Sequence, residues 1–183
     1  MSDDSFDALQ SQIDQDGAPA GRAVAYRGPE GLGGWLILIG IGLVVSIVQL
    51  VNALATTYFP IFTQGQWQAL TTPGSPNYHP LWAPALLLEV LGNLLFFAMA
   101  TTLLVMYFCK SRWFPRIFIA YILSNFVFVT LDHFLSQAIP AVAAQGSSDT
   151  AVQIFRSFLS AAIWAPYMLV STRVKNTFRE AAE

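Results

Sequence analysis

The stretch WLILIGIGLVVSIVQLVNALATTY, residues 35–58, decides the fold of this chain. It runs for about 24 residues without a charged side chain, and its apolar residues would cover every face of a helix. About 20 apolar residues in a helix are enough to cross the hydrocarbon core of a bilayer. The stretch therefore predicts a retained membrane-spanning helix.

Three further apolar stretches, Ala85–Phe108, Ile117–Ile139 and Val152–Val170, have similar lengths, and prolines, glycines and polar residues separate them. A transmembrane β-barrel would instead show segments of about 10 residues with strict alternation. Helices satisfy their own backbone hydrogen bonds in lipid. We therefore predict an all-α polytopic membrane protein whose residues 31–179 form a four-helix transmembrane bundle, with helices at about 35–58, 85–108, 117–139 and 152–172.

The composition supports a location in the membrane. Apolar residues make up 55% of the chain and charged residues only 11%, which lies outside the range of ordinary soluble domains. The net charge of −2 gives no sign of a nucleic-acid partner. Cys109 is the single cysteine, which excludes an internal disulfide and a paired-cysteine metal or redox site.

The two ends of the chain are polar. Residues 1–30 contain six acids and two arginines and too few apolar side chains to offset the entropy of ordering. This composition predicts a disordered acidic tail, and residues 180–183 form a short C-terminal tail. The acidic start does not fit a secretory signal, which begins with basic residues.

The basic residues predict the orientation. Eight of the nine flank the apolar stretches on one side, whereas residues 59–84 and 140–151 contain no lysine or arginine. Because basic residues are retained on the cytoplasmic side, both termini and the short loop after Phe108 are expected to be cytoplasmic. Six of these residues form a candidate site for anionic lipid headgroups or act on topology alone: Lys110, Arg112, Arg116, Arg173, Lys175 and Arg179.

Polar residues inside the spans are the candidate functional site, because an ionisable side chain in hydrocarbon costs at least about 2.5 kcal/mol. Counted inward from the outer helix ends, Glu89 lies about 6 Å deep, Arg156 about 7 Å and Asp132 about 10 Å. Asn52 lies about 9 Å deep. The predicted intramembrane cluster consists of Asn52, Glu89, Asn93, Asp132, His133 and Arg156, all in the outer half of the bilayer.

Two interpretations of this cluster remain open. In the first, Arg156 pairs with Glu89 or Asp132, and the cluster fixes which helix faces which. In the second, the excess of carboxyl groups over the single arginine marks a site for a proton or a cationic solute. Asp132 and His133 are neighbours that point about 100° apart on a helix, so they are not expected to act together.

Other functional signals are weak. The chain contains no HExxH, G-x-S-x-G or P-loop motif, and neither histidine has a second one at metal-ligand spacing. We therefore expect no enzyme activity, no metal and no cofactor. Cys109, at the end of an apolar stretch, is a weak candidate for acylation, and an inert thiol is the default interpretation.

Several motifs resemble one known family. They are GLGGWL at 31–36, IWAPY at 163–167, STRVKNTF at 171–178, Glu89 with Asn93, Phe114-Pro115 and Arg156-Ser157. Together they resemble the bacterial membrane family called domain of unknown function 2569, over about residues 31–179. The resemblance implies a bacterial inner-membrane location and four helices, but no established activity.

Two functions follow as expectations. The first is a non-enzymatic accessory protein that assembles with an unknown membrane protein in the cell envelope, because catalytic motifs are lacking. The alternative is a small transporter linked to protons or cations, because the polar cluster contains excess carboxyl groups.

Overall fold

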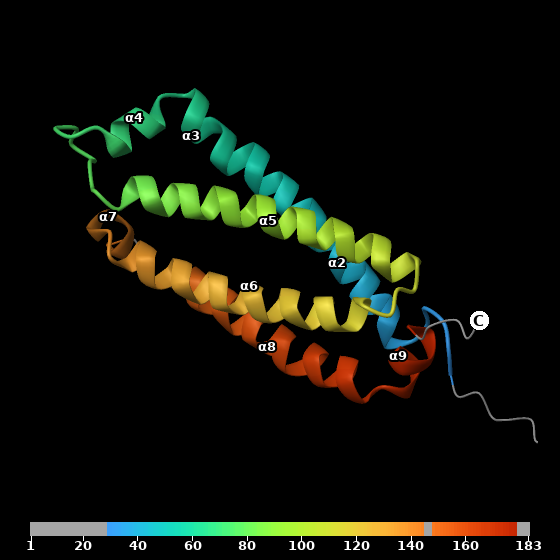
Figure 1. The fold of residues 1–183 in the computed structure, drawn as a ribbon. Helices are drawn as coiled ribbons and strands as arrows, with labels where there is room; N and C mark the ends of the chain where they lie inside the picture. The colour runs from blue at the N-terminus through green and yellow to red at the C-terminus, as the bar shows by residue number, and fades with distance from the viewer. Residues whose placement is uncertain (1–28, 145–147, 179–183) are drawn as a thin grey trace, which may run out of the picture.

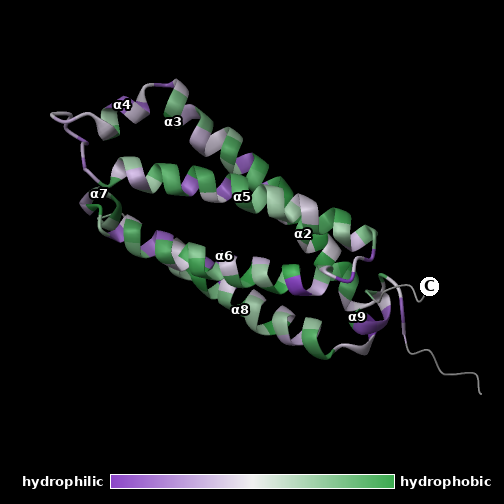
Figure 2. Ribbon diagram, in the orientation of Figure 1, coloured by the Kyte–Doolittle hydropathy of each residue, from purple (hydrophilic) through white to green (hydrophobic). Residues whose placement is uncertain are grey.

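The computed structural model describes residues 29–144 and 148–178, and the regular structure within these residues is entirely helical (Figure 1). Most of the predicted acidic tail, Arg179 and the tail at 180–183 lie outside the described residues. Three helices are long and apolar enough to cross a membrane: Trp35–Thr63, Trp82–Phe108 and Phe114–Gln137. Figure 2 shows hydrophobic residues along most of their length.

The first span is longer than predicted. It consists of α2 (Trp35–Ala53), the π-helix η1 (Leu54–Tyr58) and α3 (Phe59–Thr63), followed by the short helix α4 (Gln66–Thr71). The expected end at residue 58 assumed that Pro60 would stop the helix, because proline cannot donate the bond to the fourth preceding residue. Here Pro60 lies in the first turn of α3, directly after a wider π-helical turn, so the helical path continues.

The second and third spans each begin three residues before their predicted starts. α5 runs over Trp82–Phe108 and α6 over Phe114–Gln137, and the short helix α7 (Pro140–Ala143) follows. Pro84 and Pro115 lie within the first turns of α5 and α6, where the missing N–H costs no helical hydrogen bond. α6 also ends two residues earlier than expected.

The fourth predicted span differs most from expectation. α8 (Ser148–Val170) begins earlier than residue 152 and ends at Val170, and Ser171 separates it from α9 (Thr172–Thr177). Ser171 caps α9 by accepting a hydrogen bond from the Val174 amide at 3.4 Å. α8 is not among the candidate spans, because polar residues between Asp149 and Ser160 lower its hydropathy.

The long helices form two pairs (Figure 1). α2 packs along α5, and α8 packs along α6, while contacts between α5 and α6 join the pairs. Gly92 of α5 permits this junction, because a Cβ there would overlap the ring of Phe128 on α6. The pairs diverge toward the end that holds α3, α4 and α7, which we call the α7 end. The opposite end is called the α9 end.

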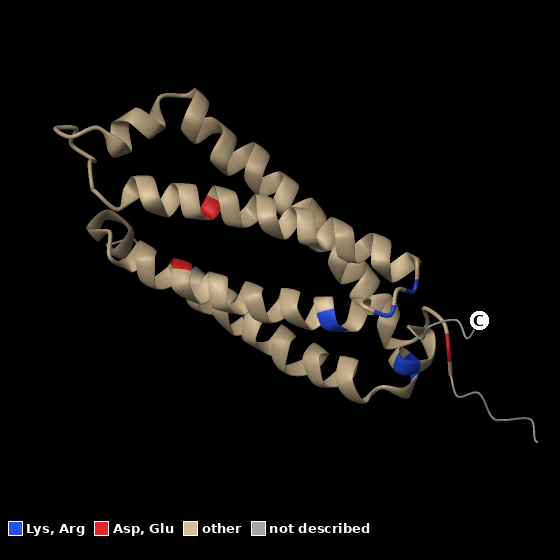
Figure 3. Cartoon of the chain, in the orientation of Figure 1, with Lys and Arg blue, Asp and Glu red and all other residues tan. Residues whose placement is uncertain are grey.

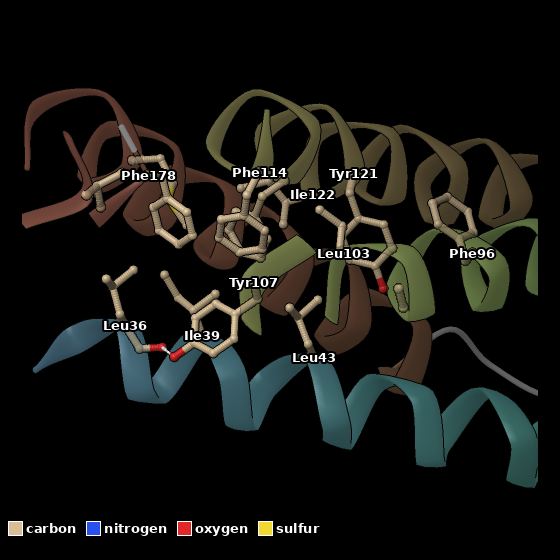
Figure 4. Packing of buried hydrophobic residues seen from close by; sticks show 14 residues of the cluster. Leu36, Ile39, Leu43, Phe96, Leu103, Tyr107, Phe114, Tyr121, Ile122 and Phe178 are labelled. Atoms are coloured by element: carbon tan, nitrogen blue, oxygen red, sulfur yellow. Dashed lines mark hydrogen bonds between the residues drawn. The ribbon is translucent and has the colours of Figure 1, made fainter. Parts of the chain in front are cut away.

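A buried aromatic and aliphatic core lies toward the α9 end (Figure 4). The ring centroids of Phe114 and Phe178 are 4.7 Å apart, and those of Tyr107 and Phe114 are 5.5 Å apart. Such pairs contribute about 0.5–1.5 kcal/mol each beyond the area they bury. The Tyr107 hydroxyl also donates to the Leu36 carbonyl oxygen at 2.9 Å, which ties α5 to α2.

The segment before α2 is held by α9. The Gly31 amide donates to Oγ1 of Thr177 at 2.9 Å, and Oγ1 of Thr177 lies 3.1 Å from the Gly31 carbonyl oxygen, to which it donates. A Cβ at Gly33 would lie 2.9 Å from Nη1 of Arg173. The glycines at the start of the described chain therefore make room for α9.

Candidate functional site

A cavity of about 770 Å³ lies between the four long helices. This volume is within the range of about 300–1,000 Å³ that is typical of ligand pockets. Its polar lining comes from all four long helices and η1. The polar residues are Ser46, Gln49, Tyr58, Glu89, Asn93, Tyr121, Asn125, Asp132, Gln153, Arg156, Ser157 and Ser160.

The two carboxyl groups of the spans face each other in this cavity. Glu89 of α5 and Asp132 of α6 lie within hydrogen-bonding reach of one another, and Figure 3 shows one acidic position on each of these two helices. Two carboxyl groups attract only when one of them holds a proton that it can donate to the other. Oδ1 of Asp132 is buried and has no hydrogen-bond partner. The pair therefore has unused capacity to bind a proton or a cationic group.

Two neutral residues lie beside Glu89. Nδ2 of Asn93 donates to the backbone carbonyl of Glu89 at 2.8 Å and to the hydroxyl of Tyr58 at 3.2 Å. The Tyr58 hydroxyl also lies within hydrogen-bonding reach of the Glu89 carboxyl group. Tyr58 belongs to the π-helical segment η1, which therefore brings a side chain of the first span to the acid pair.

Arg156 lines the same cavity but forms no ion pair with the two acids. All three residues are described, and no ion pair of 4.0 Å or less joins Arg156 to Glu89 or Asp132. The Arg156 side chain is exposed. The pairing on which the first interpretation of the cluster depends is therefore absent from this structure. One cationic and two carboxylic groups remain as separate lining groups.

Glu89, Asp132 and Arg156 lie at similar depths when the depths are counted from the observed helix ends. At about 1.5 Å per residue, Asp132 lies about 8 Å from the α7 end of its helix, Glu89 about 10 Å and Arg156 about 12 Å. The three charged residues of the predicted cluster therefore occupy one layer.

Two predicted members of the cluster are elsewhere. Asn52 is exposed and does not line the cavity, since the face of α2 that does so carries Gln49 and Ala53. Because the first span continues to Thr63, Asn52 also lies deeper than predicted, about 16 Å from its end. His133 points away from the cavity, and its buried Nδ1 has no hydrogen-bond partner. Asp132 and His133 thus diverge, as their adjacent positions predict.

Sequence reasoning missed several lining residues. Gln49, Asn125 and Gln153 are uncharged polar residues within or beside apolar stretches, and Tyr58 looked like an aromatic residue at the membrane interface. The spacing of Gln153, Arg156, Ser157 and Ser160 on α8 repeats every three to four residues, so these residues share one helical face. That periodicity is the signal that could have identified them.

The cavity is bounded toward the α9 end and open along one side. Phe96, Phe118 and Ile122 are buried lining residues that also belong to the core. The hydroxyl groups of Tyr121 and Ser46 meet beside them, joining α6 to α2. In contrast, Gln49 and Arg156 are exposed.

The described basic residues of the predicted lipid site gather at the α9 end, away from the cavity (Figure 3). Lys110, Arg112 and Arg116 lie around the turn between α5 and α6. The guanidinium carbons of Arg112 and Arg116 are each 5.4 Å from the ring centroid of Trp113, a cation–π arrangement. Arg173 and Lys175 belong to α9.

Two further features concern chemistry outside the cavity. Within the described residues, no group of three or more His, Cys, Asp or Glu side chains could hold a metal ion. Cys109 is exposed and free at the end of α5, and its acylation stays a prediction.

Comparison with known proteins gives one match. The family described as "Protein of unknown function (DUF2569)" matches residues 29–179, as the sequence motifs predicted. No curated protein and no solved structure matches the chain.

Proposed function

Because the chain belongs to the DUF2569 family, whose function is unknown, we propose its function from the cavity: a small membrane transporter linked to protons or cations. The observation that carries this proposal is the facing pair Glu89 and Asp132 in a polar cavity. A proton or a cationic solute between the two carboxyl groups would remove the repulsion between them.

The open cavity favours transport over a purely structural role. A structural cluster would be expected to pair its charges fully, because an unpaired charge in hydrocarbon is expensive. Arg156 instead remains apart from both acids, and Asp132 keeps an unpartnered oxygen. Compensation by a bound proton or solute is therefore the better account of these groups.

The proposal includes the topology. We propose that the α9 end faces the cytoplasm of a bacterial inner membrane, because the basic residues gather there. We also propose that α8 is a fourth span. Its 23 residues extend about 35 Å, more than the hydrocarbon thickness of about 30 Å. Its polar face lines the cavity, and Phe155, Phe158 and Ile163 are exposed where lipid would cover them.

The role proposed is non-enzymatic, supported by the lack of recognisable catalytic motifs in the sequence. The carboxyl pair would act by binding and releasing a cation, with Tyr58, whose hydroxyl accepts a hydrogen bond from Asn93, orienting the Glu89 carboxyl group.

Proteoliposomes test the proposal. The full chain is reconstituted in vesicles that contain a pH-sensitive dye, and proton movement is followed after a pH step, with Na⁺ or K⁺ present or absent. We expect flux above that of empty vesicles, and we expect Glu89→Gln or Asp132→Asn to reduce it at least about tenfold. Glu30→Gln is the matched control, because it neutralises an exposed carboxyl group outside the cavity.

The control should retain full flux. If the wild-type protein moves no ions, or if the cavity variants conduct as well as the control, transport through the acid pair is wrong.

The second candidate function is an accessory protein that assembles with other envelope components. The observation that favours it is the exposed basic surface at the α9 end, which includes Lys110, Arg116 and Lys175. A partner with an acidic segment would match this surface. Crosslinking followed by affinity purification would test this function, and recovery of no reproducible partner would count against it.

A further inference from the structure

The exposed part of the cavity lining is confined to two helices. Of the lining residues, α5 and α6 contribute only buried or half-buried ones. The exposed ones belong to α2 and α8: Leu38, Gly42, Gln49, Gln153 and Arg156. The mouth of the cavity therefore runs between the edges of α2 and α8, and in a bilayer it would open sideways toward lipid.

The two helices meet at one end of this mouth. The rings of Trp35 and Trp164 are in edge contact there, with centroids 6.3 Å apart, at the α9 end. Farther toward the α7 end, Gln49 of α2 and Arg156 of α8 are both exposed. A ligand that enters from the bilayer would therefore pass Arg156 on its way to the acid pair.

The lining changes character along the membrane normal. Charged and amide side chains, including Glu89, Asp132 and Arg156, lie toward the α7 end. Toward the α9 end most of the lining consists of buried core residues such as Leu43 and Phe118, and its polar groups are the uncharged hydroxyls of Ser46 and Tyr121. A phospholipid in the leaflet at the α7 end has the same order, with its headgroup outward and its acyl chains toward the midplane.

The charges also restrict the headgroup. A guanidinium group binds phosphate through two parallel hydrogen bonds, and a carboxylate binds an ammonium group. Arg156 and the acid pair are not joined by an ion pair, so each is available to a different part of one ligand. A ligand with both a phosphate and a primary amine would compensate Arg156 and one carboxylate, while the other carboxyl group of the pair would hold a proton.

We propose that the cavity binds an aminophospholipid through its mouth between α2 and α8, with the phosphate at Arg156 and the ammonium group at Glu89 and Asp132. This inference rests on the proposed function, since it names the cationic solute that the acid pair would take. The acyl chains would lie along the apolar part of the mouth, between exposed residues such as Leu38 and Ile163.

Native mass spectrometry of the full chain in detergent tests the proposal. The probes are phosphatidylethanolamine, phosphatidylglycerol and diacylglycerol with identical acyl chains, together with water-soluble glycerophosphoethanolamine. We expect phosphatidylethanolamine to bind at least about tenfold more tightly than phosphatidylglycerol, because only the former supplies the amine. Equal binding of these two lipids to the wild-type protein would overturn the proposal, and this readout depends on no variant.

Variants separate the two ends of the headgroup. Arg156→Gln should weaken the binding of both phospholipids about tenfold or more. Arg156→Lys should weaken it less, because lysine keeps the positive charge but loses the two parallel hydrogen bonds. The double variant Glu89→Gln, Asp132→Asn should lower the affinity for phosphatidylethanolamine to that for phosphatidylglycerol. The affinity for phosphatidylglycerol should not change. Glu30→Gln is the control, because it changes an exposed charge outside the cavity and outside the basic surface, and it should change the binding of neither lipid.

The source of the headgroup is tested in the same experiment. If glycerophosphoethanolamine binds as tightly as the intact lipid, the ligand is a soluble phosphate compound and the lipid proposal is wrong. Ion flux in vesicles made only of phosphatidylglycerol separates this inference from the proposed function. Ion flux in these vesicles without selective lipid binding would overturn the lipid proposal and leave ion transport standing. Selective lipid binding without ion flux would overturn ion transport and leave the lipid proposal standing.

Discussion

A methyl group at Gly92 should loosen the junction between the two helix pairs. A Cβ there would lie 3.2 Å from Cε1 of Phe128, and Cζ and Cε2 of the same ring would be closer still. The ring cannot retreat freely, because it stands in edge contact with Phe96 at a centroid separation of 5.3 Å. Overpacking of this kind costs about 1–3 kcal/mol.

Gly42 provides the matched control, because a Cβ there would meet no atom within 4 Å. Replacing a helical glycine by alanine favours the helix by up to about 1 kcal/mol at either position, so this contribution cancels between Gly92→Ala and Gly42→Ala. We expect Gly92→Ala to be less stable than Gly42→Ala by about 1–3 kcal/mol. Thermal unfolding in detergent measures the difference as a lower Tm.

Phe128→Leu in the Gly92→Ala background should recover part of this loss, because the smaller side chain relieves the overlap. Equal melting temperatures for Gly92→Ala and Gly42→Ala would refute the idea that close approach at Gly92 joins the pairs.

Three further outcomes are expected. Tyr107→Phe should lower the free energy of unfolding by about 0.5–1.5 kcal/mol, because it removes the 2.9 Å hydrogen bond to Leu36, and equal denaturation midpoints would contradict this. Thr177→Val should release α9 from the Gly31 segment, because it removes both hydrogen bonds between them, and amide hydrogen exchange over residues 172–178 should become faster. Lys175→Gln is the control, and its exchange rates should not change. Reporters fused at residues 70 and 145 should lie on the opposite side of the membrane from one at 112, and a common side for 70 and 112 would overturn the proposed topology.

Three spans were predictable from the sequence because their residues are apolar on every face. Their ends were less predictable, since the effect of a proline depends on the turn in which it lies. Pro60 follows a π-helical turn, and Pro84 and Pro115 belong to first turns, so none of them ends its helix where composition alone suggests.

The candidate site was predictable only in part. Glu89, Asp132 and Arg156 stand out because a charge in an apolar stretch is rare, and depth counting placed them in one layer. Counting depth does not show which way a side chain points, and for this reason the predicted polar cluster includes Asn52 and His133, which do not line the cavity. The lack of an ion pair at Arg156 depends on how α5, α6 and α8 pack and on where their side chains point, which no local pattern encodes.

Thiol labelling from the α7 side tests most directly whether the acid pair lies in an accessible polar cavity. In a Cys109→Ser background, a membrane-impermeant, water-soluble thiol reagent is added to vesicles that carry Asp132→Cys or Leu131→Cys. Leu131 neighbours Asp132 on α6 but is 60% exposed on the helix surface, outside the cavity lining. The proposed cavity predicts rapid labelling at position 132 and little at 131, whereas equal protection of both positions would contradict it.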